Sequence, residues 1–246
     1  MNAITKLNDT IANGSAKSLT TIAFDQIRND ILLCRLPPDK RLRITGLAER
    51  YEVGATAIRE ALSRLVTDGL VVSEDQRGFC VAPVSRAELL DLTQTRIDIE
   101  TLALGKAIAQ GDIDWESHVI SNFHRLSKSP PPTDQGGELH ERWGTVHRQF
   151  HESLVAGCKS PWLIRLTQLL YDKSERYRNL AEFKPASNMR DTVKEHMELM
   201  NAIVGRDFEL SKKLISQHFW ETTNIILETD FATPRLSKAA NKKLLA

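Results

Sequence analysis

The chain has 246 residues, 41% of them hydrophobic, and a formal net charge of +1 at pH 7. This length suits two modest domains, and the near-zero charge excludes a generally basic surface as the way to bind nucleic acid. No apolar run approaches the length of a membrane span, and the first twenty residues lack the layout of a secretion signal, so we expect a cytoplasmic protein without membrane contact. The cysteines Cys34, Cys80 and Cys158 are scattered and indicate neither a disulfide framework nor a thiolate metal site.

Residues 19–84 have the pattern of a small DNA-binding domain. The predicted elements are a helix from near Thr20 to Pro37, a short helix over Thr45–Arg50, a helix from Ala57 closed by Gly69, and the apolar runs Leu70–Val72 and Phe79–Val81. The two runs flank a turn and predict a β-hairpin. Helix, helix, turn, helix and hairpin is the order of a winged helix-turn-helix domain. The polar residues 1–18 before it predict a disordered arm.

The third predicted helix has the features of a DNA-reading helix. In a helix-turn-helix, one helix enters the major groove while its partner braces against the backbone. Gly54 supplies the turn, Thr56, Arg59 and Arg64 lie on the outer face, and Arg77 at the hairpin tip can reach the minor groove or the backbone. The alternative is an ordinary helical subdomain with solvated arginines, and the hairpin that follows in the right place argues against it.

Residues 85–230 predict an all-α domain. Helices are expected over Ser85–Gln110, Asp114–Ser127, Glu138–Gly157, Ser160–Ala181, Ser187–Val204 and Asp207–Thr229. The absence of alternating strands and helices argues against an α/β enzyme core, and the basic tail over 231–246 is expected to be frayed. The predicted fold is therefore mainly α: an N-terminal winged helix-turn-helix with a small β-hairpin wing and a C-terminal helical bundle.

Four histidines fall on the apolar faces of three of these helices: His147, His151, His196 and His218. The first two are four residues apart and therefore share one helix face. A buried imidazole must be hydrogen-bonded or bind a metal, because an unsatisfied polar group costs about 1–3 kcal/mol. For any one of them a hydrogen-bonded core histidine is the simpler interpretation. The four together favour a shared site for a divalent transition metal, with zinc or nickel as the first candidates.

The stretches LAERYEVGATAIREALSRLVTDGLV and RGFCVAPV resemble the winged helix of the GntR family over residues 19–84. The resemblance implies DNA contacts at Arg35, Thr56, Arg59 and Gly78, and a homodimer on a palindromic operator. Arg59 is expected to meet a guanine edge or a phosphate. Many relatives carry an arginine where this chain has Ala55, and that arginine commonly reads a base, so we expect a different operator here.

Residues 85–229 resemble the FCD ligand-binding domain of the FadR subgroup, a helical bundle with a buried metal. That family usually has Asp-x-x-x-His and then one histidine on each of the last two helices. The stretch HRQFH fits with His147 in place of the aspartate, and His196 and His218 fit the later positions. The resemblance also implies that Arg96, on the first helix of the domain, binds a carboxylate of the effector. The alternative for Arg96 is a surface ion pair with Glu100.

The stretches GATAIREALSRL, HRQFHESLVAGCKSPWL and LYDKSERYR are most similar to the carbon-starvation-induced, CsiR-like regulators, which respond to glutarate. This resemblance implies a small dicarboxylate effector, with one carboxylate on the metal and the other on Arg96 or an arginine such as Arg176, because an arginine fork holds a carboxylate in bidentate geometry.

The function expected from these features is an effector-controlled transcriptional repressor. Two alternatives stay open. A metal-dependent enzyme fused to a DNA-binding module is disfavoured because four histidines fill the shell of a tetrahedral ion. A ligand-independent DNA-binding protein is disfavoured because a merely structural bundle gains little from a buried polar cluster.

Overall fold

The computed structural model describes residues 18–74, 77–129, 138–181, 190–229 and 231. Within these ranges the chain forms nine helices and three short strands, which confirms the mainly helical fold predicted from the sequence. The chain divides into two compact units, one holding Asp39–Ala82 with the residues up to Asp30, the other holding Ile31–Pro38 with the residues from Pro83 onward. The arm and the tail expected at the two ends lie almost entirely outside the described residues.

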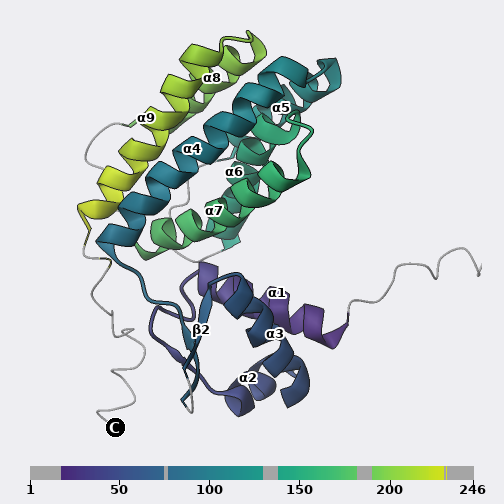
Figure 1. The fold of residues 1–246 in the computed structure, drawn as a ribbon, viewed down its shortest axis with the longest axis vertical. Coiled ribbons are helices and arrows are strands. Elements are labelled where there is room, and N and C mark those ends of the chain that lie inside the picture. Colours follow the sequence, from purple (N-terminus) through teal and green to yellow (C-terminus); the bar gives the residue numbers. More distant parts are fainter. Residues whose placement is uncertain (1–17, 75–76, 130–137, 182–189, 230, 232–246) are drawn as a thin grey trace, which may run out of the picture. The chain divides into compact units, whose positions relative to one another are not determined.

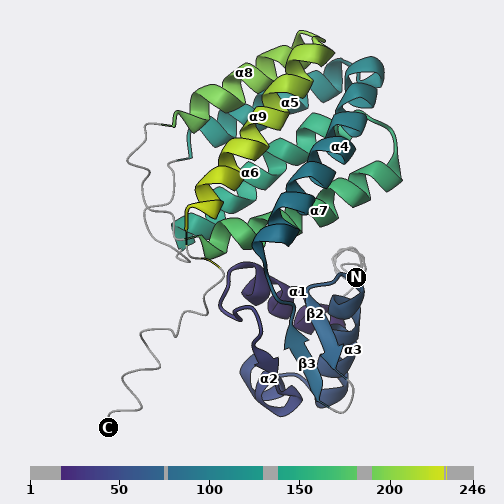
Figure 2. The same cartoon turned by 60° about the vertical axis from the view of Figure 1, so that its left-hand side comes forward.

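The first unit is built from three helices and a small sheet. Its elements are α1 (Leu19–Leu32), β1 (Arg41–Leu42), α2 (Ile44–Tyr51), α3 (Ala55–Thr67), β2 (Val71–Glu74) and β3 (Gly78–Val81). The sheet is antiparallel with the order β1-β3-β2, and Phe79 pairs with Leu42 on one side and with Ser73 on the other. Figure 2 shows β2 and β3 side by side next to α3. The hairpin was predicted, whereas β1 was not.

The burial of one face of α3 explains why this helix has a fixed orientation in its unit. Ile58, Leu62 and Leu65 follow the i, i+4, i+7 spacing and are all 0% exposed. Gly69, with a φ of +62°, turns the chain in the left-handed region that glycine adopts without strain, as its predicted capping role requires. The opposite face of α3 is therefore left to the solvent.

The second unit is a bundle of six helices among the described residues. They are α4 (Arg86–Gln110), α5 (Ile113–Ser127), α6 (Glu138–Ala156), α7 (Pro161–Leu180), α8 (Thr192–Val204) and α9 (Phe208–Leu227). The long helix α4 packs against α6, α7 and α9, while α5 packs against α6 and α8 (Figure 1). Side chains cap five of these helices, and the oxygens of Ser85 and Asp207 accept the predicted capping bonds from Glu88 and Leu210. The bundle brings α6, α8 and α9 together around its interior.

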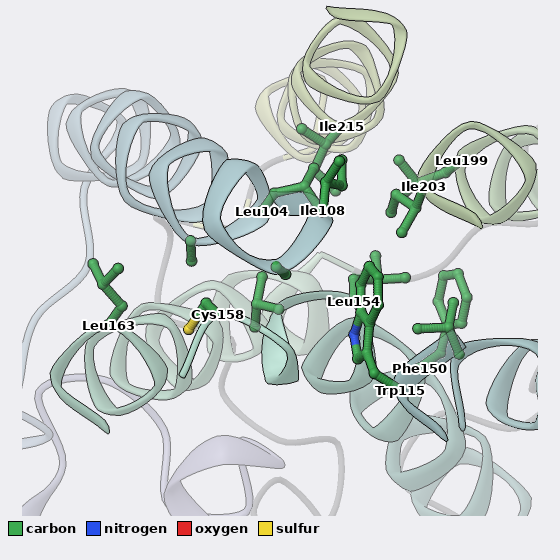
Figure 3. Packing of buried hydrophobic residues seen from close by; sticks show 14 of the residues in the cluster. Leu104, Ile108, Trp115, Phe150, Leu154, Cys158, Leu163, Leu199, Ile203 and Ile215 are labelled. Carbon is green, nitrogen blue, oxygen red and sulfur yellow. The ribbon is translucent and has the colours of Figure 1, made fainter. Parts of the chain in front are cut away.

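Trp115 of α5 anchors the apolar core at one end of the bundle. Its indole Nε1 donates to the Ser153 carbonyl at 2.9 Å, and the ring packs beside Leu154 of α6 (Figure 3). The neighbouring core residues are Leu104, Ile108, Phe150, Leu199, Ile203 and Ile215. Satisfying the indole N–H lets this large side chain lie 7% exposed in the core.

Gly157, just after α6, lets the Trp115 ring approach the backbone. A Cβ at Gly157 would lie 2.9 Å from the indole carbon Cδ2, so Gly157→Ala should destabilise the protein by about 1–3 kcal/mol. Gly144→Ala is the matched control, because its Cβ would meet only Glu175 Oε1 at 3.5 Å and alanine favours the helix by up to about 1 kcal/mol. Urea unfolding of both variants measures this, and equal stabilities for the two would contradict the packing described.

None of the helices in the described ranges combines the length and the apolarity that a bilayer-spanning helix needs.

The three cysteines carry free thiols.

Candidate metal centre and DNA-reading surface

The four histidines meet inside the helical bundle. Each offers one ring nitrogen, and these nitrogens all lie within 4.8 Å of one another. His147 and His151 come from α6, His196 from α8 and His218 from α9, and these residues are between 3% and 8% exposed. Three helices that are separate in the sequence thus direct imidazoles to one buried point.

Hydrogen bonds from neighbouring helices hold two of the four rings. His147 Nδ1 lies 2.7 Å from the Tyr171 hydroxyl, and His218 Nδ1 lies 3.0 Å from Glu195 Oε2. Such partners fix the ring orientation and the tautomer of metal-binding histidines, and they increase the basicity of the ligand nitrogen.

Three buried ring nitrogens of the cluster have no hydrogen-bond partner among the described residues. They are both ring nitrogens of His151 and Nε2 of His196. Leaving a buried acceptor unsatisfied costs about 1–3 kcal/mol, so the apo arrangement is unfavourable unless something fills the centre. A divalent transition ion bound by four neutral imidazoles fits this donor set, because nitrogen ligands suit zinc and nickel.

The pKa values of the four rings favour metal ligation. Burial lowers the pKa of each, and it brings that of His218 to about 4 although the hydrogen bond with Glu195 opposes the change. The imidazoles are therefore neutral near pH 7, which is the form that binds a metal.

Glu195 and Arg190 support His218 from outside the centre. Arg190 pairs with both oxygens of Glu195, at 2.6 and 2.7 Å, and also donates to the His218 carbonyl at 3.2 Å. Burial alone would raise the pKa of Glu195, but the hydrogen bonds from His218 and Arg190 lower it to about 2. Neither residue was identified from the sequence, because the contact of Glu195 with His218 joins α8 to α9 across the bundle.

Arg96 lies in the bundle interior rather than at the surface. It is 3% exposed, its Nε donates to Glu100 at 2.5 Å and its Nη1 donates to Ser174 at 3.0 Å. The ion pair with Glu100 is therefore buried, so the surface alternative for this pair is wrong. The guanidinium also lies 3.9 Å from the centroid of the Phe219 ring, next along α9 from His218.

Arg176 and Arg178 face different surroundings although both lie near the end of α7. Arg176 is 3% exposed. Burial raises the pKa of the Cys34 thiol to about 12, and the nearby positive charge of Arg176 opposes this rise. Arg178 lies 4.8 Å from the centroid of Tyr171, whose hydroxyl contacts His147. Sequence reasoning proposed Arg176 for the effector and did not identify Arg178.

The outer face of α3 carries the polar residues that were proposed to read DNA. Thr56 and Arg59 are exposed. Gly54 is the N-cap residue before α3, and no side chain caps the helix there. Arg64 is also exposed, with its guanidinium 4.1 Å from the centroid of Phe24 in α1. Open amides and an arginine at a helix N-terminus suit a phosphate backbone and base edges.

The other proposed contact residues lie outside α3. In the wing, Arg77 is exposed and Gly78 opens β3 with a φ of +83°. Arg35 pairs with Glu141 of α6. The described structure thus gives Arg35 an acidic partner, whereas Arg59 has no ion pair with a described residue.

Comparisons with known proteins match two family models to the chain. Residues 19–81 match the family model described as bacterial regulatory proteins, gntR family, and residues 91–220 match that of the FCD domain. The chain belongs to the GntR family of transcriptional regulators and carries an FCD domain. GntR-family members bind DNA operators, and this chain is therefore a transcriptional regulator and not an enzyme.

Two similar proteins support the assignment, and one solved structure shares the fold. An uncharacterized HTH-type transcriptional regulator, BphR of Paraburkholderia xenovorans (strain LB400), is 38% identical over 88% of this chain and 87% of its own length. The HTH-type transcriptional repressor GlaR of Escherichia coli (strain K12) is 34% identical over 81% of this chain and 92% of its own. The solved structure of E. coli McbR/YncC has a TM-score of 0.72 at 20% identity, covering 87% of this chain and 99% of that one, and shares the fold.

Proposed function

We propose that this GntR-family regulator is a repressor whose operator binding is controlled by a small carboxylate at the histidine centre. The observation that carries the proposal is the meeting of four buried imidazoles from α6, α8 and α9 at one point, where nitrogens of His151 and His196 have no hydrogen-bond partner among the described residues. A purely structural bundle would gain nothing from this costly arrangement, which disfavours a ligand-independent DNA-binding protein. Repression is supported by the 34% identical relative described as a repressor.

The resident group is proposed to be a zinc or nickel ion held by His147, His151, His196 and His218. When bound, it supplies a positive charge that can accept an oxygen ligand. Four imidazoles already satisfy a tetrahedral ion, so binding an effector carboxylate as well requires an ion that takes more than four ligands. Nickel in a tetragonal site does this readily, and zinc can expand to five.

The effector is proposed to be a short dicarboxylate such as glutarate, in keeping with the resemblance to CsiR-like regulators. Arg96 supports this choice, because its guanidinium is buried next to the centre and its Nη2 has no acceptor among the described residues. A carboxylate is the acceptor that best matches a guanidinium fork.

DNA binding is proposed to use Thr56, Arg59 and Arg64 of α3 together with the wing residues Arg77 and Gly78. Arg35 is proposed as a further contact, which would require it to leave Glu141. As in other symmetric regulators, a homodimer would place two such surfaces on a palindromic operator. A regulator of this kind acts in the cytoplasm, where its DNA is.

The test of this function is a mobility-shift titration of the protein on the DNA upstream of its own gene, with a panel of small acids and with a chelator. The expected result is that a dicarboxylate weakens binding about 5- to 150-fold, the range of ordinary allosteric coupling. The effect should disappear in Arg96→Ala. If none of the acids changes the operator affinity of the metal-loaded protein, the proposal fails.

A further inference from the structure

Tyr171 of α7 connects the histidine centre to a group of arginines. Its side chain is 2% exposed, and its hydroxyl lies 2.7 Å from His147 Nδ1. The guanidinium carbons of Arg96, Arg148 and Arg178 lie 5.1, 4.4 and 4.8 Å from the centroid of its ring. Three positive charges are therefore separated from a metal-binding ring by one aromatic side chain.

Two of these three arginines are neutralised within the described structure. Arg148 pairs with Asp172 at 2.6 Å and also with Glu175. Arg96 pairs with Glu100 at 2.5 Å. The pairing of Arg96 is nevertheless incomplete, because its Nη2 is buried and has no acceptor in the described residues. A charged donor without an acceptor is more costly than a neutral one, and this cost points to a missing anion.

Arg178 has no ion pair with a described residue, and its guanidinium contacts the Tyr171 ring. Its charge reaches the interior. Burial raises the pKa of Glu100, and the charges of Arg96 and Arg178 oppose that rise. Within the part of the chain that the structure describes, the positive charge of Arg178 therefore has no anion paired with it.

We propose that Arg178, together with the unpaired Nη2 of Arg96, holds the distal carboxylate of a short dicarboxylate whose other carboxylate lies at the histidine centre. This inference rests on the proposed function, since it assigns residues to the same ligand. It replaces Arg176, whose charge acts near Cys34. It also gives a reason for selecting dicarboxylates, because a monocarboxylate of the same length would leave Arg178 and the Nη2 of Arg96 without an anionic acceptor.

The test is calorimetric titration of the full-length, zinc-loaded protein with glutarate and with pentanoate, a monocarboxylate of equal carbon number. Arg178→Gln should bind glutarate about tenfold to a hundredfold more weakly, the loss expected for a charge-assisted pair. Its affinity for pentanoate and its zinc content should not change. Arg178→Lys, which keeps the charge without the planar fork, should recover part of the loss.

Arg176→Gln is the matched control, two residues away on the same helix, and should bind glutarate as the wild type does. Full glutarate affinity in Arg178→Gln would overturn the inference, as would an equal loss for both acids or a loss confined to Arg176→Gln. In these cases the proposed function stands, because the wild type still binds glutarate. Failure of the wild type to bind either acid, with no effect of any acid on operator affinity, would overturn both.

Discussion

Replacing His151 with alanine is expected to reduce zinc affinity at least a hundredfold and to abolish the effect of chelators on thermal stability. The ring offers a nitrogen within 4.8 Å of those of the other three histidines, and neither of its nitrogens has another partner in the described structure. Loss of a residue that only hydrogen-bonds a metal ligand typically costs 10- to 100-fold in metal affinity. Loss of a ligand itself should cost at least as much. The measurements are metal content after dialysis and melting temperature with and without chelator.

His118→Ala is the matched control for this experiment. His118 lies on α5, is exposed and stands apart from the centre, so its removal should leave zinc content and the chelator effect at their wild-type values. Zinc content as high in His151→Ala and His218→Ala as in the wild type would show that the imidazoles do not form the metal site.

Arg59→Ala is expected to weaken operator binding about 5- to 150-fold without changing the folded structure. The side chain is exposed on α3, and Ile58 beside it stays buried, so the variant should lose the proposed DNA contact without losing core packing. An arginine to a guanine edge contributes about 1–3 kcal/mol of discrimination. Fluorescence anisotropy with a labelled operator measures the loss, and circular dichroism checks the fold.

Arg165→Ala, on an exposed part of α7, serves as the control for the loss of one surface charge. It should bind the operator as tightly as the wild type. Operator affinity of Arg59→Ala equal to that of Arg165→Ala would mean that α3 does not read the DNA through this residue.

Most of the fold could be predicted because local patterns specify it. The apolar spacing of Ile58, Leu62 and Leu65 predicts α3, and the oxygens of Ser85 and Asp207 mark helix starts through local capping bonds. Strand β1 was missed because its two residues, Arg41 and Leu42, are too few to show the alternation of apolar and polar residues that marks a strand. Its pairing with β3 is a contact between distant parts of the sequence.

The histidine site was predictable in part, because each imidazole sits on an apolar stripe of its own helix. The convergence of the rings depends on how α6, α8 and α9 pack, and periodicity along one helix does not determine that. The residues that contact the histidines were harder still to predict from the sequence. Tyr171 and Glu195 contact histidines on other helices, and no spacing within a helix links them to His147 or His218.

The choice between Arg176 and Arg178 shows the same limit at a finer scale. Residues two apart on an α-helix are rotated by about 200° and point to nearly opposite sides. The sequence offers arginines at both positions of α7, and only the packing of α7 shows that Arg178 lies against Tyr171. A stretch rich in arginines therefore predicts that an anion can be bound, without indicating which side chain faces it.

The most direct test of the account is the operator affinity of the zinc-loaded wild type and of His151→Ala, each titrated with glutarate in fluorescence anisotropy. The wild type should release the operator as glutarate is added, with an affinity at least fivefold weaker at saturation, and His151→Ala should not respond. The same glutarate response in both proteins would mean that the histidine centre does not control DNA binding.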